Sequence, residues 1–305
     1  MSDSNDNLAV EKTLLAEASQ KPLPARWGTY AKLSGPGWLQ GAITLGGGSL
    51  AGSLYIGVIG GYELLWLQPL MMIFGVLMLS VIGYVTLSTG EKPFRAINKH
   101  INPVLGWGWL IAAMLANLVW AMPQFALGTA AIQQNFEILE GDNGKYICAL
   151  LLFVIGAAVV WSYDSSNKGV KVFEIILKVM VAIVVLSFFG VVIVMAGELE
   201  WGKILAGFVP NFNLLSEPAS KFTEIIAQSS NPEYWKEVIL DSQRNRMVTA
   251  AATAVGINMT FLLPYSMLRK GWGREHRGLA TFDLSLGLFL PFFLATTCVV
   301  IASAS

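Results

Sequence analysis

Three consecutive glycines interrupt an apolar stretch that is otherwise long enough to cross a membrane as a helix. The stretch covers residues 39–59, and its middle reads Gly46-Gly47-Gly48-Ser49. Glycine has the largest entropic cost of the ordinary residues in a helix, so we expect the helix to break here and to leave backbone carbonyls without helical partners. Inside a membrane, such a break is tolerated only where the backbone is buried in protein or lines a watery cavity. Broken helices of this kind form the substrate sites of transporters, so the run favours that class.

The composition is that of a protein embedded in a membrane. Hydrophobic residues make up 54% of the 305 residues and charged residues only 13%, whereas a soluble domain has about 25% charged residues. The formal net charge of zero argues against a nucleic-acid partner, which would require a basic surface. We therefore expect the lipid bilayer and a small ion or solute to be the partners of this chain.

Seven apolar segments have lengths near the roughly 20 residues that cross a bilayer as a helix. They follow a polar tail, residues 1–33, which lacks the apolar core of a secretory signal and which we expect in the cytosol. The predicted spans are residues 36–59, 64–88, 104–132, 146–163, 172–196, 247–268 and 279–303. The chain is thus predicted to be an all-α, multi-pass integral membrane protein.

Basic residues gather in alternate connections between these spans. They precede the first span and follow the second, fourth and sixth, whereas residues 60–63 contain none and residues 133–145 contain one lysine. Since lysine and arginine are retained on the cytoplasmic side, the pattern predicts a cytoplasmic amino terminus, in the cell (inner) membrane. The basic residues concerned are Lys21, Arg26, Lys32, Lys92, Arg95, Lys99, Lys168, Lys171, Arg269, Lys270, Arg274 and Arg277.

The sixth span carries a second candidate break. Val255, Gly256, Asn258 and Thr260 combine a helix-weakening glycine with an amide and a hydroxyl, and Pro264 follows within about one further turn. Glycine in a membrane helix can also simply allow close packing of helices, and for Gly256 both interpretations stay open. Two broken helices, the first and the sixth, are what an inverted repeat of five spans would produce, with a binding site between the breaks near the membrane midplane.

This repeat defines the expected organisation of residues 34–305 as one transporter domain. The first five-helix repeat covers about 34–197, an extracellular loop about 198–245, and the start of the second repeat about 246–305. The loop is expected to pack tightly, with a short surface helix near residues 232–240. Because two repeats of five spans need ten helices, we expect this sequence to be a fragment that lacks the later spans.

Few polar side chains lie within the other spans. Asn117 and Gln124 in the third span are two turns apart and share one helix face, which we expect to look into the bundle. Hydrogen bonding between helices is the favoured role of these amides, with an ion pathway as the alternative. Glu174 and Lys178 are expected to pair on one helix surface, and Asp283 to cap a helix or pair with the arginines before it.

The glycine run belongs to a longer pattern. In order, the chain carries Gly35-Pro36-Gly37, the run from Gly46 to Ser49, Gly61-Tyr62 and Leu64-Leu65-Trp66. This pattern resembles the first helix of the Nramp divalent-metal transporters, which read Gly-Pro-Gly, Asp-Pro-Gly-Asn, Gly-Tyr and Leu-Leu-Trp at the same spacings, and the likeness covers nearly the whole chain from Gly35. It implies a LeuT-type (APC superfamily) inverted-repeat fold with broken helices 1 and 6, transport by alternating access, and a metal site between those helices.

The departures from the family pattern fall at this implied metal site. Gly46 and Ser49 stand where the family has the ligands Asp and Asn, and Asn258 and Thr260 stand where its sixth helix has Met and His. Ser49 and Asn258 are the side chains that could still contact a metal, and the third-helix amides stand where the family has acidic residues linked to proton movement. The candidate substrate site comprises Gly46, Gly47, Gly48, Ser49, Val255, Gly256, Asn258 and Thr260, with Asn117 and Gln124 as pathway candidates.

The donor atoms at these positions limit what the site can hold. Hydroxyl, amide and carbonyl oxygens suit hard cations, whereas the thioether and imidazole that favour transition metals are missing. We expect a hard divalent cation such as magnesium, which keeps several of its waters, rather than manganese or iron. A small neutral or zwitterionic solute, and a non-transporting scaffold or sensor that retains the fold, are the alternatives.

Other chemistry finds little support in the sequence. No nucleophile with a paired base, no phosphate loop and no cofactor motif stands out, so we expect neither an enzyme nor a bound cofactor. Cys148 and Cys298 lie in apolar runs and are expected only to pack. His100 and His276 lie among charged loop residues and are expected at the solvated surface.

Overall fold

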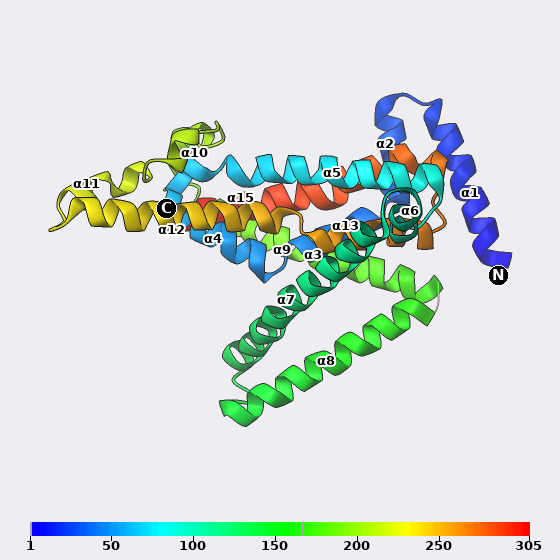
Figure 1. The fold of residues 1–305 in the computed structure, drawn as a ribbon, viewed down its shortest axis with the longest axis horizontal. Helices are drawn as coiled ribbons and strands as arrows, with labels where there is room; N and C mark the ends of the chain where they lie inside the picture. Colours follow the sequence, from blue (N-terminus) through cyan, green and yellow to red (C-terminus); the bar gives the residue numbers. More distant parts are fainter. Residues whose placement is uncertain (1, 166) are drawn as a thin grey trace. The chain divides into compact units, whose positions relative to one another are not determined.

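The computed structural model describes residues 2–165 and 167–305 (Figure 1). Met1, in the predicted tail, and Ser166, in the predicted first repeat, lie outside the described residues. The described residues form helices and turns, and no strand occurs among them. The α-helices are α1 (Ser2–Ser19), α2 (Leu23–Leu33), α3 (Pro36–Thr44), α4 (Gly47–Gly60), α5 (Leu67–Thr89), α6 (Pro93–His100), α7 (Pro103–Phe136), α8 (Gly141–Ser165), α9 (Asn167–Met195), α10 (Trp201–Ala206), α11 (Thr223–Ala227), α12 (Pro232–Ala254), α13 (Ile257–Arg269), α14 (Arg277–Leu284) and α15 (Leu290–Ala304). Short 3-10 turns form η1 (Gly61–Leu64), η2 (Phe212–Leu215), η3 (Ser220–Phe222) and η4 (Arg274–His276), and η5 (Ser285–Phe289) is a π-helical turn.

Seven membrane spans are compatible with these helices. Six helical segments are long and apolar enough to cross a membrane, and the bent pair α3 and α4 supplies a seventh. The predicted number of spans is confirmed. Counted in chain order with the bent pair first, the sixth span begins at Pro232, inside the predicted loop. Its helix starts there because Asn231 accepts a hydrogen bond from the Tyr234 amide, and it runs to Ala254. The short surface helix expected near residues 232–240 is therefore the polar first part of α12.

The chain forms two compact units. The first comprises Met1–Leu39, Val81–Val179 and Ile257–Asp283, and the second comprises Gln40–Ser80, Met180–Gly256 and Leu284–Ser305.

In the first unit, α7 is the helix on which others pack. Helices α6, α8 and α13 all contact α7. In Figure 1, α7 and α8 run in opposite directions from a short connection. Asn102 starts α7 by accepting a hydrogen bond from the Val104 amide at 2.8 Å, with Pro103 as its first residue. Many large apolar side chains of α7 and α8 stay exposed, as expected of helices that face lipid.

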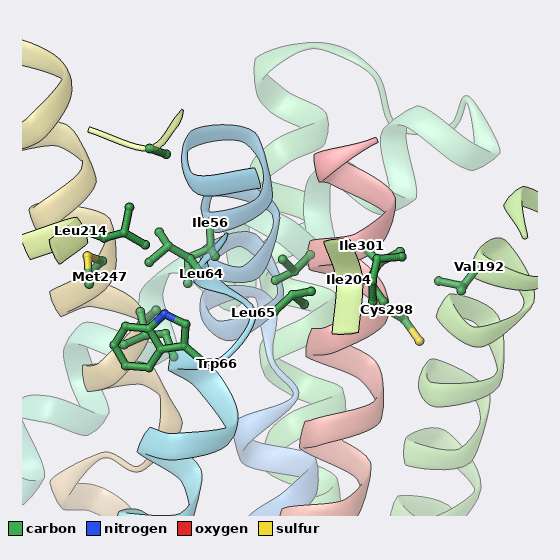
Figure 2. Packing of buried hydrophobic residues seen from close by; sticks show 14 of the residues in the cluster. Ile56, Leu64, Leu65, Trp66, Val192, Ile204, Leu214, Met247, Cys298 and Ile301 are labelled. Carbon is green, nitrogen blue, oxygen red and sulfur yellow. The ribbon is translucent and has the colours of Figure 1, made fainter. Parts of the chain in front are cut away.

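In the second unit, α4 packs against both α12 and α15. The contact with α15 is close because a β-carbon on Gly57 would collide with Ser303 and with the Val300 carbonyl oxygen. An apolar cluster surrounds the turn between α4 and α5, where Figure 2 shows Ile56, Leu64 and Trp66 beside Met247 of α12. Burial of these apolar side chains stabilises the unit.

A polar residue of α12 holds the segment before it in place. The side chain of Gln243 is fully buried; it accepts from the Ala219 amide at 2.9 Å and donates to the carbonyls of Leu214 and Glu217 at 2.5 and 3.0 Å. The segment also reaches α4, since the ammonium group of Lys221 donates to the Val58 carbonyl at the carboxyl end of that helix. Residues 214–221 are thus tied to two helices.

Candidate functional site

The first predicted break is present and is narrower than the glycine run. Helix α3 ends at Thr44, α4 begins at Gly47, and the two axes differ by 52°. Gly46 has extended backbone (φ −81°, ψ 177°) and starts α4, while Gly47, Gly48 and Ser49 form its first turn. The interruption is therefore confined to Leu45 and Gly46, and three of the four residues expected to be broken are helical.

Ser49 satisfies one of the carbonyls that the break releases. Its buried hydroxyl donates to the Thr44 carbonyl and lies 3.1 Å from the Gly46 carbonyl. A hydroxyl has one hydrogen to donate and two lone pairs. Ser49 can hold the Thr44 carbonyl with that hydrogen and still offer Oγ lone pairs to a ligand.

The second predicted break lies where the sequence placed it. Helix α12 ends at Ala254 and α13 begins at Ile257, with Val255 in an extended conformation (φ −143°, ψ 111°). The Val255 side chain packs on α5, because a β-carbon on Gly75 would lie 2.9 Å from Val255 Cβ. Pro264 lies inside α13 and does not interrupt it.

The polar residues after the second break contact α7 within the first unit. Asn258 Nδ2 donates to Asn117 Oδ1 at 3.3 Å, and Thr260 Oγ1 accepts from Trp109 Nε1 at 3.1 Å. Gln124 does not join them, because its amide donates to the Trp120 carbonyl of its own helix at 3.4 Å. Hydrogen bonding between helices, the favoured role for the third-span amides, is thus present for Asn117.

The candidate site residues are distributed over both units. Gly46 to Ser49, Val255 and Gly256 belong to the second unit, and Asn117, Gln124, Asn258 and Thr260 belong to the first. That all of them form one binding site stays a prediction.

A charged cluster holds the start of α3. Glu174 interacts electrostatically with Lys178, as predicted, and each also has a partner on another segment. Glu174 binds Lys270 of α13 at 3.3 Å, and Lys178 donates to the Ser34 carbonyl at 2.9 Å. Asp283 accepts from the amides of Gly35 and Gly37 at 3.0 and 2.6 Å. Asp283 therefore caps the amino end of α3, a helix other than its own.

His276 is also placed differently from expectation. It is fully buried and stacks on Trp272 with 5.7 Å between ring centroids, and its Nδ1 accepts from the Gly273 amide at 3.1 Å. His100 is exposed, as expected, and lies 3.2 Å from Glu91. Both cysteines are buried and free, in agreement with a packing role.

A hollow of about 580 Å³ in the second unit contains charged groups as well. Tyr62, Glu63, Lys203 and Lys221 are among its lining residues. The hydrogen bond that Lys203 donates to the Glu200 carboxylate raises the pKa of Lys203, whereas burial lowers the pKa of Lys221. Glu63 accepts hydrogen bonds from the Ser220 amide at 3.0 Å and from the Ser220 hydroxyl. The charged side chains of Glu63, Lys203 and Lys221 thus all have partners within the protein. We therefore interpret the hollow as a space between loops and not as a binding site.

Comparison with known proteins identifies the family. The family model described as natural resistance-associated macrophage protein-like matches residues 37–305. The chain belongs to the Nramp family. The fold is therefore the LeuT-type fold of that family, and the predicted all-α membrane architecture is confirmed.

Individual Nramp relatives are similar over part of their length. The chain is 28% identical to the metal transporter Nramp2 of Oryza sativa subsp. japonica over 168 residues, which cover 53% of this chain and 30% of that protein. It is 25% identical to the manganese transporter pdt1 of Schizosaccharomyces pombe over 190 residues, 61% of this chain and 35% of the relative. The chain thus spans about a third of the length of the curated relatives it matches. These relatives are transporters, as predicted, and the family implies neither an enzyme nor a bound cofactor.

The residues predicted to form the substrate site include no charged side chain. Among residues 2–165 and 167–305, no three histidine, cysteine, aspartate or glutamate side chains gather as they would to hold a metal ion. Sequence reasoning found both breaks but missed Ser53 and Gln68, whose side chains are buried beside Ser49. The i, i+4 spacing of Ser49 and Ser53 was the available signal.

Proposed function

We propose that this chain is the part of a membrane transporter that binds and moves a hard divalent cation, with magnesium favoured over manganese or iron, by alternating access. The supporting observation is the set of donors at the two breaks. Ser49, Asn258 and Thr260 offer hydroxyl and amide oxygens, and Gly46 offers only its backbone. Oxygen donors without thioether, imidazole or thiolate favour hard cations.

The absence of a carboxylate from this donor set bears on how the cation would bind. A divalent ion stripped of its water would meet no opposing charge, so its desolvation would be unfavourable. Magnesium dehydrates reluctantly and commonly keeps several waters. A partly hydrated ion held by Ser49 and Asn258 through direct and water-mediated contacts fits such a site. The basic residues in alternate connections support a cytoplasmic amino terminus in the cell (inner) membrane.

Uptake into proteoliposomes tests the proposal. The full-length protein should take up Mg²⁺ in preference to Mn²⁺, and Ser49→Ala combined with Asn258→Ala should lower the rate about tenfold, as expected when one or two hydrogen-bond-sized contacts are lost. Ser187→Ala is the matched control, because this exposed hydroxyl donates only to its own helix at Ile183. Uptake of Mn²⁺ but not Mg²⁺ would contradict the assignment of the ion, and unchanged uptake in the double variant would contradict the site.

A neutral or zwitterionic solute is the second candidate. The observation that favours it is the hydrogen bond from the Ser49 hydroxyl to the Thr44 carbonyl, which occupies that carbonyl oxygen and makes it a poorer cation ligand. The amino end of α4 would then meet a carboxylate of the solute. Uptake of labelled amino acids, in the absence of any divalent-ion flux, would favour this candidate, and absence of all flux would favour a scaffold or sensor.

A further inference from the structure

A row of buried polar side chains follows the broken helix within the second unit. It comprises Gln40 and Thr44 of α3, Ser49 and Ser53 of α4, and Gln68 of α5. Gln40 and Gln68 are 0% and 2% exposed. The residues of each pair within α3 and α4 are four apart and so share a face of their helix.

Hydrogen bonds connect the residues of the row from Gln68 to Thr44. Gln68 Nε2 donates to Ser53 Oγ at 2.9 Å, Ser53 Oγ donates to the Ser49 carbonyl at 2.7 Å, and Ser49 donates to the Thr44 carbonyl. These bonds join α5 to the residues on both sides of the break. They fix the direction of each donor, and they leave the Gln68 carbonyl oxygen with no hydrogen from the row.

Amide atoms at both ends of the row lack hydrogen-bond partners among the described residues. Among the residues that the structure describes, neither Gln68 Oε1 nor either amide atom of Gln40 has a hydrogen-bond partner, although these atoms are buried. Buried polar side chains in proteins nearly always have a partner, and where protein supplies none an ordered water does. An unpartnered amide oxygen accepts hydrogens from water and is also a ligand for hard cations.

We propose that this row is a hydrated track for hard cations. Gln68 and Gln40 bind water on either side of the break, and when a cation passes, it takes the place of the water bound to each amide. The cation step rests on the proposed function, whereas the hydration of the row does not. Each amide oxygen can replace one shell water while the ion keeps the others. The hydrogen bond to Ser53 then holds the Gln68 amide beside the break.

Thiol accessibility tests the hydration directly. In the full-length protein with Cys148→Ala and Cys298→Ala, the variants Gln68→Cys and Ser53→Cys should react with a water-soluble methanethiosulfonate at least about tenfold faster than Leu79→Cys, a fully buried apolar position on the same helix as Gln68. Reaction of both cysteines no faster than that of Leu79→Cys would overturn the proposal. Two reporter positions keep the test decisive if one variant fails to fold.

Transport separates this proposal from the proposed function. Gln68→Leu should reduce Mg²⁺ uptake about tenfold, the change expected when one ion or water contact is lost, and Mg²⁺ should slow the modification of Gln68→Cys while choline does not. Unreactive cysteines in a protein that takes up Mg²⁺ would refute the track alone. Reactive cysteines in a protein that takes up no divalent ion would refute the proposed function and leave the hydrated row supported.

Discussion

Replacing Asp283 with alanine removes both hydrogen bonds that hold the start of α3. The carboxylate is 1% exposed and accepts from two backbone amides at 3.0 and 2.6 Å. Hydrogen bonds to a charged group contribute about 1.5–3 kcal/mol each, so the two together correspond to about 3–6 kcal/mol. We expect one of the largest losses of stability that a single substitution can produce here.

A second variant, Asp283→Asn, should have an intermediate effect on stability. Asp283→Asn keeps one oxygen acceptor and no charge, so it should lose about half as much free energy of unfolding as Asp283→Ala. The measurement is the midpoint of unfolding in detergent, followed by tryptophan fluorescence. Thr281→Ala, an exposed position on the same helix, is the control and should change stability by about 0.5 kcal/mol or less. An Asp283→Ala protein as stable as this control would refute the reasoning that the cap holds α3.

Three further predictions concern the second unit. Gly57→Ala should destabilise the protein by about 1–3 kcal/mol in the same assay, because the new methyl group has no room against α15. Gly190→Ala is the control and should not destabilise it, since the space around Gly190 is open. Equal effects of the two substitutions would contradict the close contact between α4 and α15. Gln243→Ala should expose residues 214–221 to proteolysis by removing three hydrogen bonds, and an unchanged cleavage rate would show that other contacts hold this segment. Since burial lowers the pKa of Lys221 from 10.5, the folded state binds fewer protons than the unfolded state between the lowered value and 10.5. Stability should therefore rise with pH across that window relative to Lys221→Met, and parallel pH profiles of the two proteins would contradict it.

Local signals in the sequence predicted the breaks, while distant partners stayed hidden. The glycines at 46–48 and Gly256 weaken a helix by their own chemistry, so both interruptions could be placed from residue type alone. The extent of the first break could not be predicted in this way, because Gly47, Gly48 and Ser49 form the first turn of α4.

The charged cluster illustrates the limit of local reasoning. Glu174 and Lys178 have the spacing of a helix-surface pair, yet each finds a partner on another segment. Asp283 and Gly35 are 248 residues apart in the sequence. No periodicity or spacing reports such a contact, and for the same reason Gln68 could not be connected with Ser53 from the sequence.

Because of the Ser49 hydroxyl, the bend between α3 and α4 does not depend on a bound ion. Where a carboxylate and an amide surround a gap in a helix, an ion that neutralises them also helps the gap to persist. Here a side chain of the protein answers the released carbonyl, so the kink needs no ion for its stability. Under the proposed function, the bend between α3 and α4 should therefore be the same with and without the ion, and the melting temperature should respond only weakly to the ion.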